Sequence, residues 1–103
     1  MPESITPDYV YLVGTLKARP GKVGDLITAV KSIVPGVRTE PGCISYAAFV
    51  DRTDPNTVVM LETWDSAAAL ETHASAPAFS GLAATFDELL SEPPVLVTLQ
   101  QLA

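Results

Sequence analysis

The sequence predicts an α+β fold with the ferredoxin-like order β-α-β-β-α-β, in which one antiparallel four-stranded sheet carries its helices on one face. Three observations predict this fold. The chain has 103 residues, the usual size of one domain. Segments rich in β-branched and aromatic residues alternate with segments whose apolar residues recur at intervals of three and four. No linker interrupts them, and there is no repeat beyond the two-fold plan itself.

The N-terminal part of the chain predicts an arm, a strand and a helix. Residues 1–8 carry two prolines and no apolar periodicity, so we expect a flexible arm before a single domain over residues 9–103. The run "YVYLVGTLKA" (9–18) is typical of a strand. A helix should open after "RPG", with Pro20 near its first turn, and Pro35-Gly36 should break or kink it. Its core-facing stripe comprises Val23, Leu26, Ile27, Val30, Ile33 and Val34.

The middle of the chain predicts a hairpin. After a turn at Pro41-Gly42, the runs "CISYAAFV" (43–50) and "TVVMLETW" (57–64) are typical of strands. The segment between them, "DRTDPN", has the composition of a turn. We therefore expect these two strands to pair antiparallel.

The C-terminal part predicts two helical segments and a last strand. Asp65 or Ser66 should cap a short helix, "AAALETHA", and Pro77 should end it and start another. The second helix should stop at "EPP" and be followed by a strand over residues 95–102. Its apolar stripe comprises Phe79, Leu82, Ala83, Phe86, Leu89 and Leu90.

Composition and charge exclude several classes of function. The net charge is −6 and the six basic residues are scattered, which argues against nucleic acid as a partner. Cys43 is the only cysteine, so no intrachain disulfide or thiolate metal cluster is expected. With one histidine and no phosphate-binding or dinucleotide motif, we expect neither a metal nor another cofactor.

The sequence also predicts where the protein resides. The N-terminal residues lack the basic start and apolar core of a secretory signal. No apolar run approaches the length of a membrane span, so no membrane partner is expected. We therefore expect a cytoplasmic protein.

The predicted strands are apolar on both faces. In the third strand, Met60 and Trp64 alternate with Val59 and Leu61, and the first and last strands show the same pattern. Helices can cover only one face of such a sheet, and a face in contact with water should carry polar residues. We therefore expect a homodimer that pairs through the other sheet face.

Three residues between Met60 and Ala74 are candidates for function, and each has a structural alternative. His73 borders the apolar stripe of its helix, so it is either a half-buried structural histidine or an acid–base group that exchanges a proton near neutral pH. Trp64 is either a core anchor or the wall of a pocket. Glu62 shares an apolar face with Trp64, which requires a polar pocket, a raised pKa or a salt bridge to Arg38 or Arg52.

Three further residues give weaker signals. Glu40 precedes the Pro-Gly turn, and Tyr46 lies inside the second strand. Cys43 has no basic neighbour in sequence to stabilise a thiolate, so we expect it to act as a small apolar residue.

The chain resembles a known family in four ordered motifs: "PGK", "EPGCISY", "DPNTVVMLETW" and H-x-x-x-P-A-F. Over roughly residues 9–100 it is similar to the antibiotic biosynthesis monooxygenase (ABM) domain, most closely to its small quinol-monooxygenase-like members. The resemblance implies a dimeric α+β barrel, in which two ferredoxin-like sheets pack face to face. It also implies a cavity between sheet and helices, where a small quinol or phenol reacts with dioxygen without flavin, haem or metal.

The resemblance also implies roles for particular residues. His73 would act as the base and Glu62 or Glu40 would orient it. An aromatic wall for the substrate would comprise Trp64, Tyr46 and Phe79.

One branch of the same superfamily degrades haem with an asparagine, a tryptophan and a histidine. The corresponding positions here are Gly14, His73 and Ala83, so haem degradation is not expected. Two other functions stay open on this scaffold. One is an isomerase of a small carbonyl compound that uses the same histidine and glutamate. The other is a non-catalytic dimeric binder of small aromatic ligands.

Overall fold

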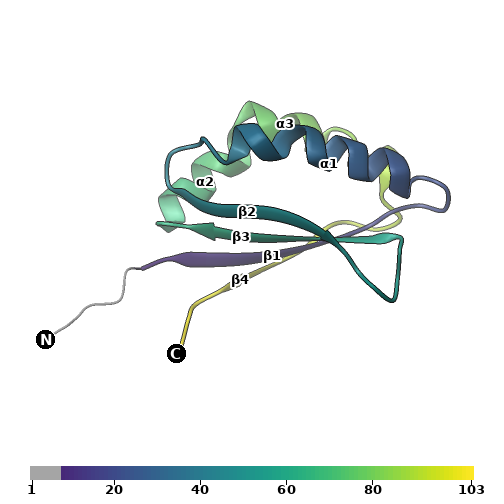
Figure 1. Cartoon of the computed structure of the whole chain (residues 1–103). Coiled ribbons are helices and arrows are strands. Elements are labelled where there is room, and N and C mark those ends of the chain that lie inside the picture. Colours follow the sequence, from purple (N-terminus) through teal and green to yellow (C-terminus); the bar gives the residue numbers. More distant parts are fainter. Residues whose placement is uncertain (1–7) are drawn as a thin grey trace, which may run out of the picture.

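A computed structural model of the chain describes residues 8–103, so all but the last residue of the expected N-terminal arm lies outside the described residues. The helices lie together on one face of a single sheet (Figure 1). The elements are β1 (Val10–Lys17), α1 (Val23–Val37), β2 (Cys43–Val50), β3 (Thr57–Trp64), α2 (Ala67–Ser75), α3 (Pro77–Ala83), α4 (Phe86–Leu89) and β4 (Val95–Leu99).

The sheet has the order β2-β3-β1-β4, and every neighbouring pair is antiparallel. This confirms the predicted ferredoxin-like fold. β1 and β3 are the central strands, and one irregularity in register lies between Cys43 and Ser45 at the start of β2. The bounds of β2 and β3 are those that the sequence predicted.

The first helix differs from the prediction at both ends. Its first residue is Val23, because Pro20 and Gly21 form a turn in which Gly21 has φ 78°. Pro35 does not break the helix, which continues to Val37. Pro35 lies in the last turn, where it removes a single helical hydrogen bond, and the next turn buries Val37 completely in the core.

The predicted helix after Pro77 is two helices, α3 and α4, separated at Ala84 and Thr85. The hydroxyl of Thr85 donates to the carbonyl of Leu82 at 2.7 Å, and its backbone N–H donates to the same carbonyl at 2.9 Å. These local bonds compete with the helical ladder and end α3. α2 begins as predicted, since Ser66 Oγ accepts a hydrogen bond from the N–H of Ala69 at 3.1 Å. The last strand ends at Leu99, three residues earlier than predicted.

The inner face of the sheet forms the core with the helices. In register across the sheet, Tyr46 of β2 lies beside Glu62 of β3, which lies beside Leu12 of β1. The next row contains Met60 and Gly14. The side chains with the deepest burial are Trp64, Leu26, Val30 and Val37.

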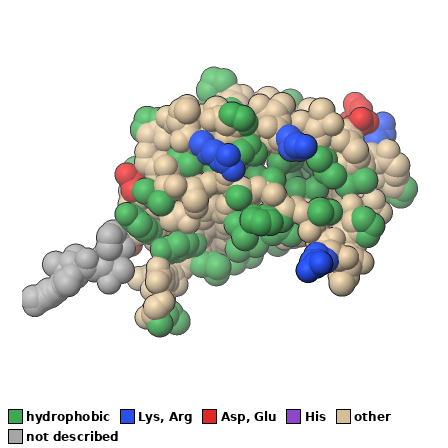
Figure 2. Space-filling view, viewed as in Figure 1, with side chains coloured by type: hydrophobic (Ala, Val, Ile, Leu, Met, Phe, Trp, Pro, Cys, Tyr) green, Lys and Arg blue, Asp and Glu red, His purple; other side chains and the backbone are tan. Residues whose placement is uncertain are grey.

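The outer face of the sheet carries no helix (Figure 1). Across the four strands it presents three rows of four residues, none of them charged: Ser45-Thr63-Tyr11-Leu99, Ala47-Leu61-Val13-Val97 and Phe49-Val59-Thr15-Val95. The large apolar side chains of these rows, such as Phe49, Leu61 and Val97, are about half exposed. The basic side chains visible in Figure 2 stand apart from one another, as the scattered sequence positions predicted.

Candidate active site

The structure brings all six predicted site residues together between the sheet and α2–α3. Tyr46, Glu62 and Trp64 come from the inner face of β2 and β3. His73 comes from α2 and Phe79 from α3, while Glu40 lies in the turn between α1 and β2.

His73 is buried, with 4% of its surface exposed, so it is not a half-exposed helix-edge residue. Its Nδ1 lies 2.8 Å from Oε1 of Glu40. The imidazole stacks on the indole of Trp64, with ring centroids 4.6 Å apart and planes inclined by 29°. A carboxylate at Nδ1 holds the ring in one orientation and leaves Nε2 as the second exchangeable position.

The turn that carries Glu40 explains how this pair forms. The N–H of Glu40 donates to Val37 O at 3.0 Å, and Gly42 has φ 82°. A Cβ at Gly42 would collide with the side chains of Ala69 and Asp65. Glycine therefore serves twice here, since it adopts the left-handed conformation and lets α2 pack against the turn. That contact sets His73 beside Glu40.

Glu62 is a buried carboxyl, with 8% of its surface exposed. The indole Nε1 of Trp64 donates to its Oε1 at 3.0 Å, so the E-x-W spacing places donor and acceptor on one strand face. Burial raises the pKa of Glu62, while the indole hydrogen bond and the nearby His73 lower it and Glu40 raises it. The partner of Glu62 is therefore an indole and not either arginine. Arg38 instead donates from Nε to the Tyr46 carbonyl at 2.9 Å.

Tyr46 is 2% exposed and packs edge-on against both Trp64 and His73. Burial raises the pKa of its phenol strongly, and the charges of Glu62 and Glu40 raise it further, so the hydroxyl keeps its proton. Among residues 8–103 we find no hydrogen-bond partner for this hydroxyl. A buried hydroxyl without a partner is costly, and a ligand or water can supply one.

A small, partly enclosed cavity lies beside these groups, and Leu96 in its lining is 55% exposed. Its volume is about 20 Å³, room for about one water molecule. Glu62 and Tyr46 supply its polar groups, and His73, Trp64 and Glu40 lie behind its wall. The lining residues are Gly14, Leu16, Tyr46, Met60, Glu62, Phe79, Leu82, Phe86, Pro94 and Leu96.

The site thus has two layers. Glu62, Tyr46 and Phe79 line the cavity. His73 contacts the rings of Tyr46 and Phe79, each at a centroid distance of 5.4 Å, and connects this layer to Glu40. Sequence reasoning missed the part that Gly14 and Phe86 play in the lining. A glycine inside a strand often marks a place where a ligand or another part of the chain approaches the backbone closely. Gly14 could have been found by that signal.

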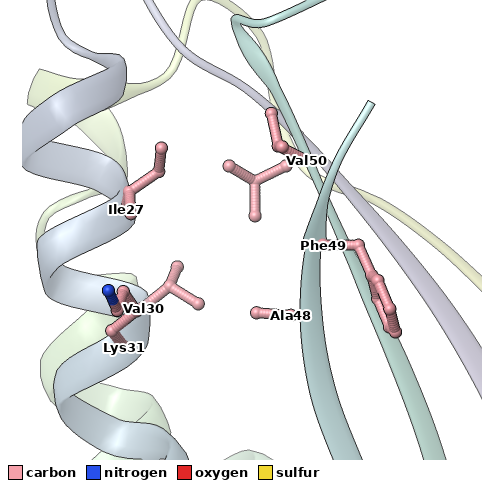
Figure 3. A pocket seen from close by; sticks show the side chains of 7 residues that line it. Ile27, Val30, Lys31, Ala48, Phe49 and Val50 are labelled. Carbon is pink, nitrogen blue, oxygen red and sulfur yellow. The ribbon is translucent and has the colours of Figure 1, made fainter. Parts of the chain in front are cut away.

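A second hollow, of about 190 Å³, lies between α1 and the edge of β2. Figure 3 shows Ile27 and Val30 of α1 facing Ala48 and Val50 of β2. Lys31 is the only titratable side chain in its lining. This groove has the larger volume, but it holds no acid–base pair and we do not assign the chemistry to it.

Other kinds of site receive no support from the described residues. Residues 8–103 contain no group of three His, Cys, Asp or Glu side chains placed to hold a metal ion. In the same range, no helix has the length and apolar character needed to cross a membrane. Burial raises the pKa of the Cys43 thiol, and Glu40 and Glu62 raise it further, which disfavours a reactive thiolate.

Residues 9–85 match the family model described as antibiotic biosynthesis monooxygenase, and this range includes all six predicted site residues. The chain belongs to the antibiotic biosynthesis monooxygenase family. The resemblance seen in its short motifs is thereby confirmed.

Three relatives illustrate what this ABM chain is similar to. Protein sll1783 of Synechocystis, which is uncharacterized, is 33% identical over 84% of the chain, and the match spans only 58% of that longer relative. YcnE of Bacillus subtilis, provisionally assigned as a monooxygenase, is 34% identical over 82% of the chain and 88% of its own length. YgiN of Escherichia coli, provisionally assigned as a quinol monooxygenase, is 33% identical over 64% of the chain and 73% of its own length.

Solved structures of similar chains show the same fold. Protein SO0527 of Shewanella oneidensis superposes with a TM-score of 0.88 at 29% identity, and the match covers 95% of both chains. β4 and the α4 segment, which lie beyond the family match, are therefore part of the shared architecture.

Proposed function

We propose that this ABM protein is a cofactor-independent monooxygenase that oxidises a small phenol or quinol. One observation carries the proposal: a buried carboxyl and a phenol without a partner among the described residues face a small, largely apolar cavity, with the Glu40–His73 pair directly behind. The provisional names of YcnE and YgiN support the monooxygenase class, and that of YgiN supports a quinol.

The chemistry requires no bound redox group because the substrate supplies the electrons. A phenolate passes one electron to dioxygen, and the radical pair combines to form a C–O bond and a hydroperoxide. Loss of water from the hydroperoxide gives the product. A phenol plus dioxygen then yields a quinone plus water, and a quinol plus dioxygen yields a hydroxyquinone plus water. The protein must remove the hydroxyl proton and keep bulk water from the radical pair.

The geometry suggests a role for each group. Glu62 lines the cavity, so it takes the hydroxyl proton of the substrate. Tyr46 keeps its own proton and donates a hydrogen bond to the developing oxyanion. His73, held by Glu40, supplies a nearby positive charge when protonated, which lowers the pKa of Glu62 and so opposes part of the effect of burial. The sequence-based prediction is that His73 is the base. Mutagenesis of His73 and Glu62 distinguishes that alternative from the present proposal.

We also propose that two copies pair through the outer sheet face. Three uncharged rows of four residues, with Leu61 and Val97 near their centre, form a continuous apolar surface. A second copy offers the same surface, which suits the self-complementary contact of a two-fold dimer. A whole sheet face should exceed the standard interface of roughly 1,600 Å² in total.

The test of the proposed activity is dioxygen uptake with a panel of hydroquinones and naphthols in the presence of EDTA. We expect uptake above the autoxidation rate of each compound. Glu62→Gln should abolish most of this excess, and Glu71→Gln on the exposed side of α2 is the matched control. If calorimetry shows that an aromatic compound binds but uptake never exceeds autoxidation, the protein is a non-catalytic binder.

A further inference from the structure

We infer that the ligand site consists of two chambers and that Phe86 is the gate between them and a specificity-determining residue. The inner chamber is the cavity at Glu62 and Tyr46. The outer chamber is a surface pocket of about 430 Å³ beside α4. It is lined by Arg19, Ala83, Phe86, Asp87, Leu90, Ser91, Glu92, Pro93 and Pro94. The inference rests on the proposed function for the identity of the substrate but not for the existence of the gate.

The dividing wall consists of two side chains. Among residues 8–103, only Phe86 and Pro94 line both chambers. The ring of Pro94 is fixed to its backbone, whereas the ring of Phe86 can turn about its χ1 bond. Phe86 is partly buried and meets the ring of Phe79 edge-on, at a centroid distance of 6.2 Å. Rotation of this one ring would join the two chambers.

The backbone around Phe86 is anchored, which favours side-chain rotation over movement of α4. Arg19 Nη2 donates to the carbonyl of Asp87 at 2.9 Å, and the N–H of Arg19 donates to Leu89 O at 2.8 Å. The side chain of Leu89 is 5% exposed. The two hydrogen bonds from Arg19 therefore hold the backbone of Asp87 and Leu89 against the loop after β1. The break at Thr85, which the sequence did not predict, sets the direction from which Phe86 closes the wall.

Size shows why a gate is needed. Ligand sites usually occupy about 300–1,000 Å³, so the inner chamber of about 20 Å³ cannot hold an aromatic ring while Phe86 is closed. The outer chamber is large enough, but neither Glu62 nor Tyr46 lines it. Glu62 also lines a hollow of about 300 Å³ beside Tyr11, but Tyr46 does not, so only the inner chamber brings the two polar groups together. A substrate ring can reach Glu62 by displacing the ring of Phe86 and packing against Phe79 in its place.

The polarity of the two chambers indicates the class of ligand. The inner chamber offers two polar side chains, Glu62 and Tyr46, among apolar ones. The polar side chains of the outer chamber are Arg19, Asp87, Ser91 and Glu92. The ligand is therefore a phenolic or quinol ring with a polar, hydrogen-bonding substituent. The ring enters the inner chamber and the substituent remains in the outer one.

Trp64 allows a test of the gate that does not depend on turnover. It is the only tryptophan of the chain, is fully buried and lies one hydrogen bond from the lining residue Glu62. We expect Phe86→Ala to raise the rate constant for quenching of its fluorescence by acrylamide severalfold. The control is Leu89→Ala, which truncates a buried residue of the same helix that lines neither chamber. Equal quenching in both variants, or no rise in Phe86→Ala, would overturn the gate.

Ligand binding tests the second half of the inference. We expect a hydroquinone with a hydroxyalkyl substituent to bind the parent more tightly than hydroquinone itself. Ala83→Leu narrows the outer chamber and should reduce that advantage. A substituent advantage that survives Ala83→Leu contradicts the two-chamber assignment. If quenching behaves as expected but no compound is oxidised, the gate stands and the proposed function fails. If a compound is oxidised but quenching is equal in both variants, the gate fails and the proposed function stands.

Discussion

Replacement of Glu62 by glutamine removes the ionisable group of the inner chamber with little change of shape. The amide of the new side chain would keep an oxygen that can accept from the indole of Trp64, a bond of 3.0 Å in the parent. Because burial raises the pKa of Glu62 above its ordinary value of 4.5, the folded protein binds this proton more tightly than the unfolded chain. The contribution of Glu62 to stability is therefore greatest at low pH and decreases as the pH rises from 4.5 to the raised pKa.

The magnitude follows from the linkage of one proton. Within that window the parent should lose up to about 1.4 kcal/mol of unfolding free energy per pH unit relative to Glu62→Gln. Above the window the difference should be constant. Turnover should fall in the same variant by roughly 10² or more, the usual contribution of a positioned base.

Urea unfolding at half-unit steps from about pH 4 to 8, followed by Trp64 fluorescence, measures the difference directly across the window in which the carboxyl titrates. Glu71→Gln, whose side chain is exposed, controls for the loss of one surface charge. Unfolding free energies that run parallel in the parent and Glu62→Gln across the whole range would refute the burial argument. A variant with the parent's turnover rate would refute the assignment of Glu62 as the base.

Three further predictions concern the neighbours of Glu62 and the outer face. His73→Ala should shift the acid limb of the pH–rate profile to higher pH, because His73 lowers the pKa of Glu62; an unshifted limb with lost activity would indicate His73 as the base. Gly14→Ala should fold, because the new Cβ meets only the end of the exposed Leu96 side chain at 3.2 Å, but it should weaken ligand binding by about tenfold, ~1.4 kcal/mol. Calorimetry that shows unchanged affinity would contradict this. Val97→Lys should convert the proposed dimer to a monomer in light scattering, and a monomeric parent would contradict the pairing.

The hairpin of β2 and β3 could be predicted to the residue because its signals are local. Alternating β-branched residues, a turn of Asp, Asn and Pro, and the serine at the start of α2 each act within a few positions. The same alternation placed Glu62 and Trp64 on one face. The partner of Glu62 could not be predicted, because the sequence does not show whether Trp64, two residues along the strand, or a distant arginine lies closer to the carboxyl.

The contact between Glu40 and His73 could not be predicted from spacing, because 33 residues separate them. It depends on how closely α2 approaches the turn at Gly42. That approach is possible because glycine has no side chain to collide with Ala69 of α2. The break between α3 and α4 was missed for a related reason. The apolar stripe runs on from Leu82 to Leu90, so periodicity predicts one helix, and the hydroxyl of Thr85 decides otherwise.

Gly14 is the smallest residue of the sheet in the lining of the cavity beside Glu62. In the row next to Tyr46 and Glu62, the residues in register are Ala48, Met60, Gly14 and Leu96. Gly14 lines the cavity beside Glu62, whereas Ala48 lines the groove between α1 and β2. A Cβ at Gly14 would lie 3.2 Å from the end of the Leu96 side chain, so a larger residue here would have to displace Leu96. On the opposite side of the cavity, the lining includes Phe86 of α4. A cavity with Gly14 in the sheet below it and the ring of Phe86 above it suits a site that must exclude water during the reaction and open for exchange of substrate and product.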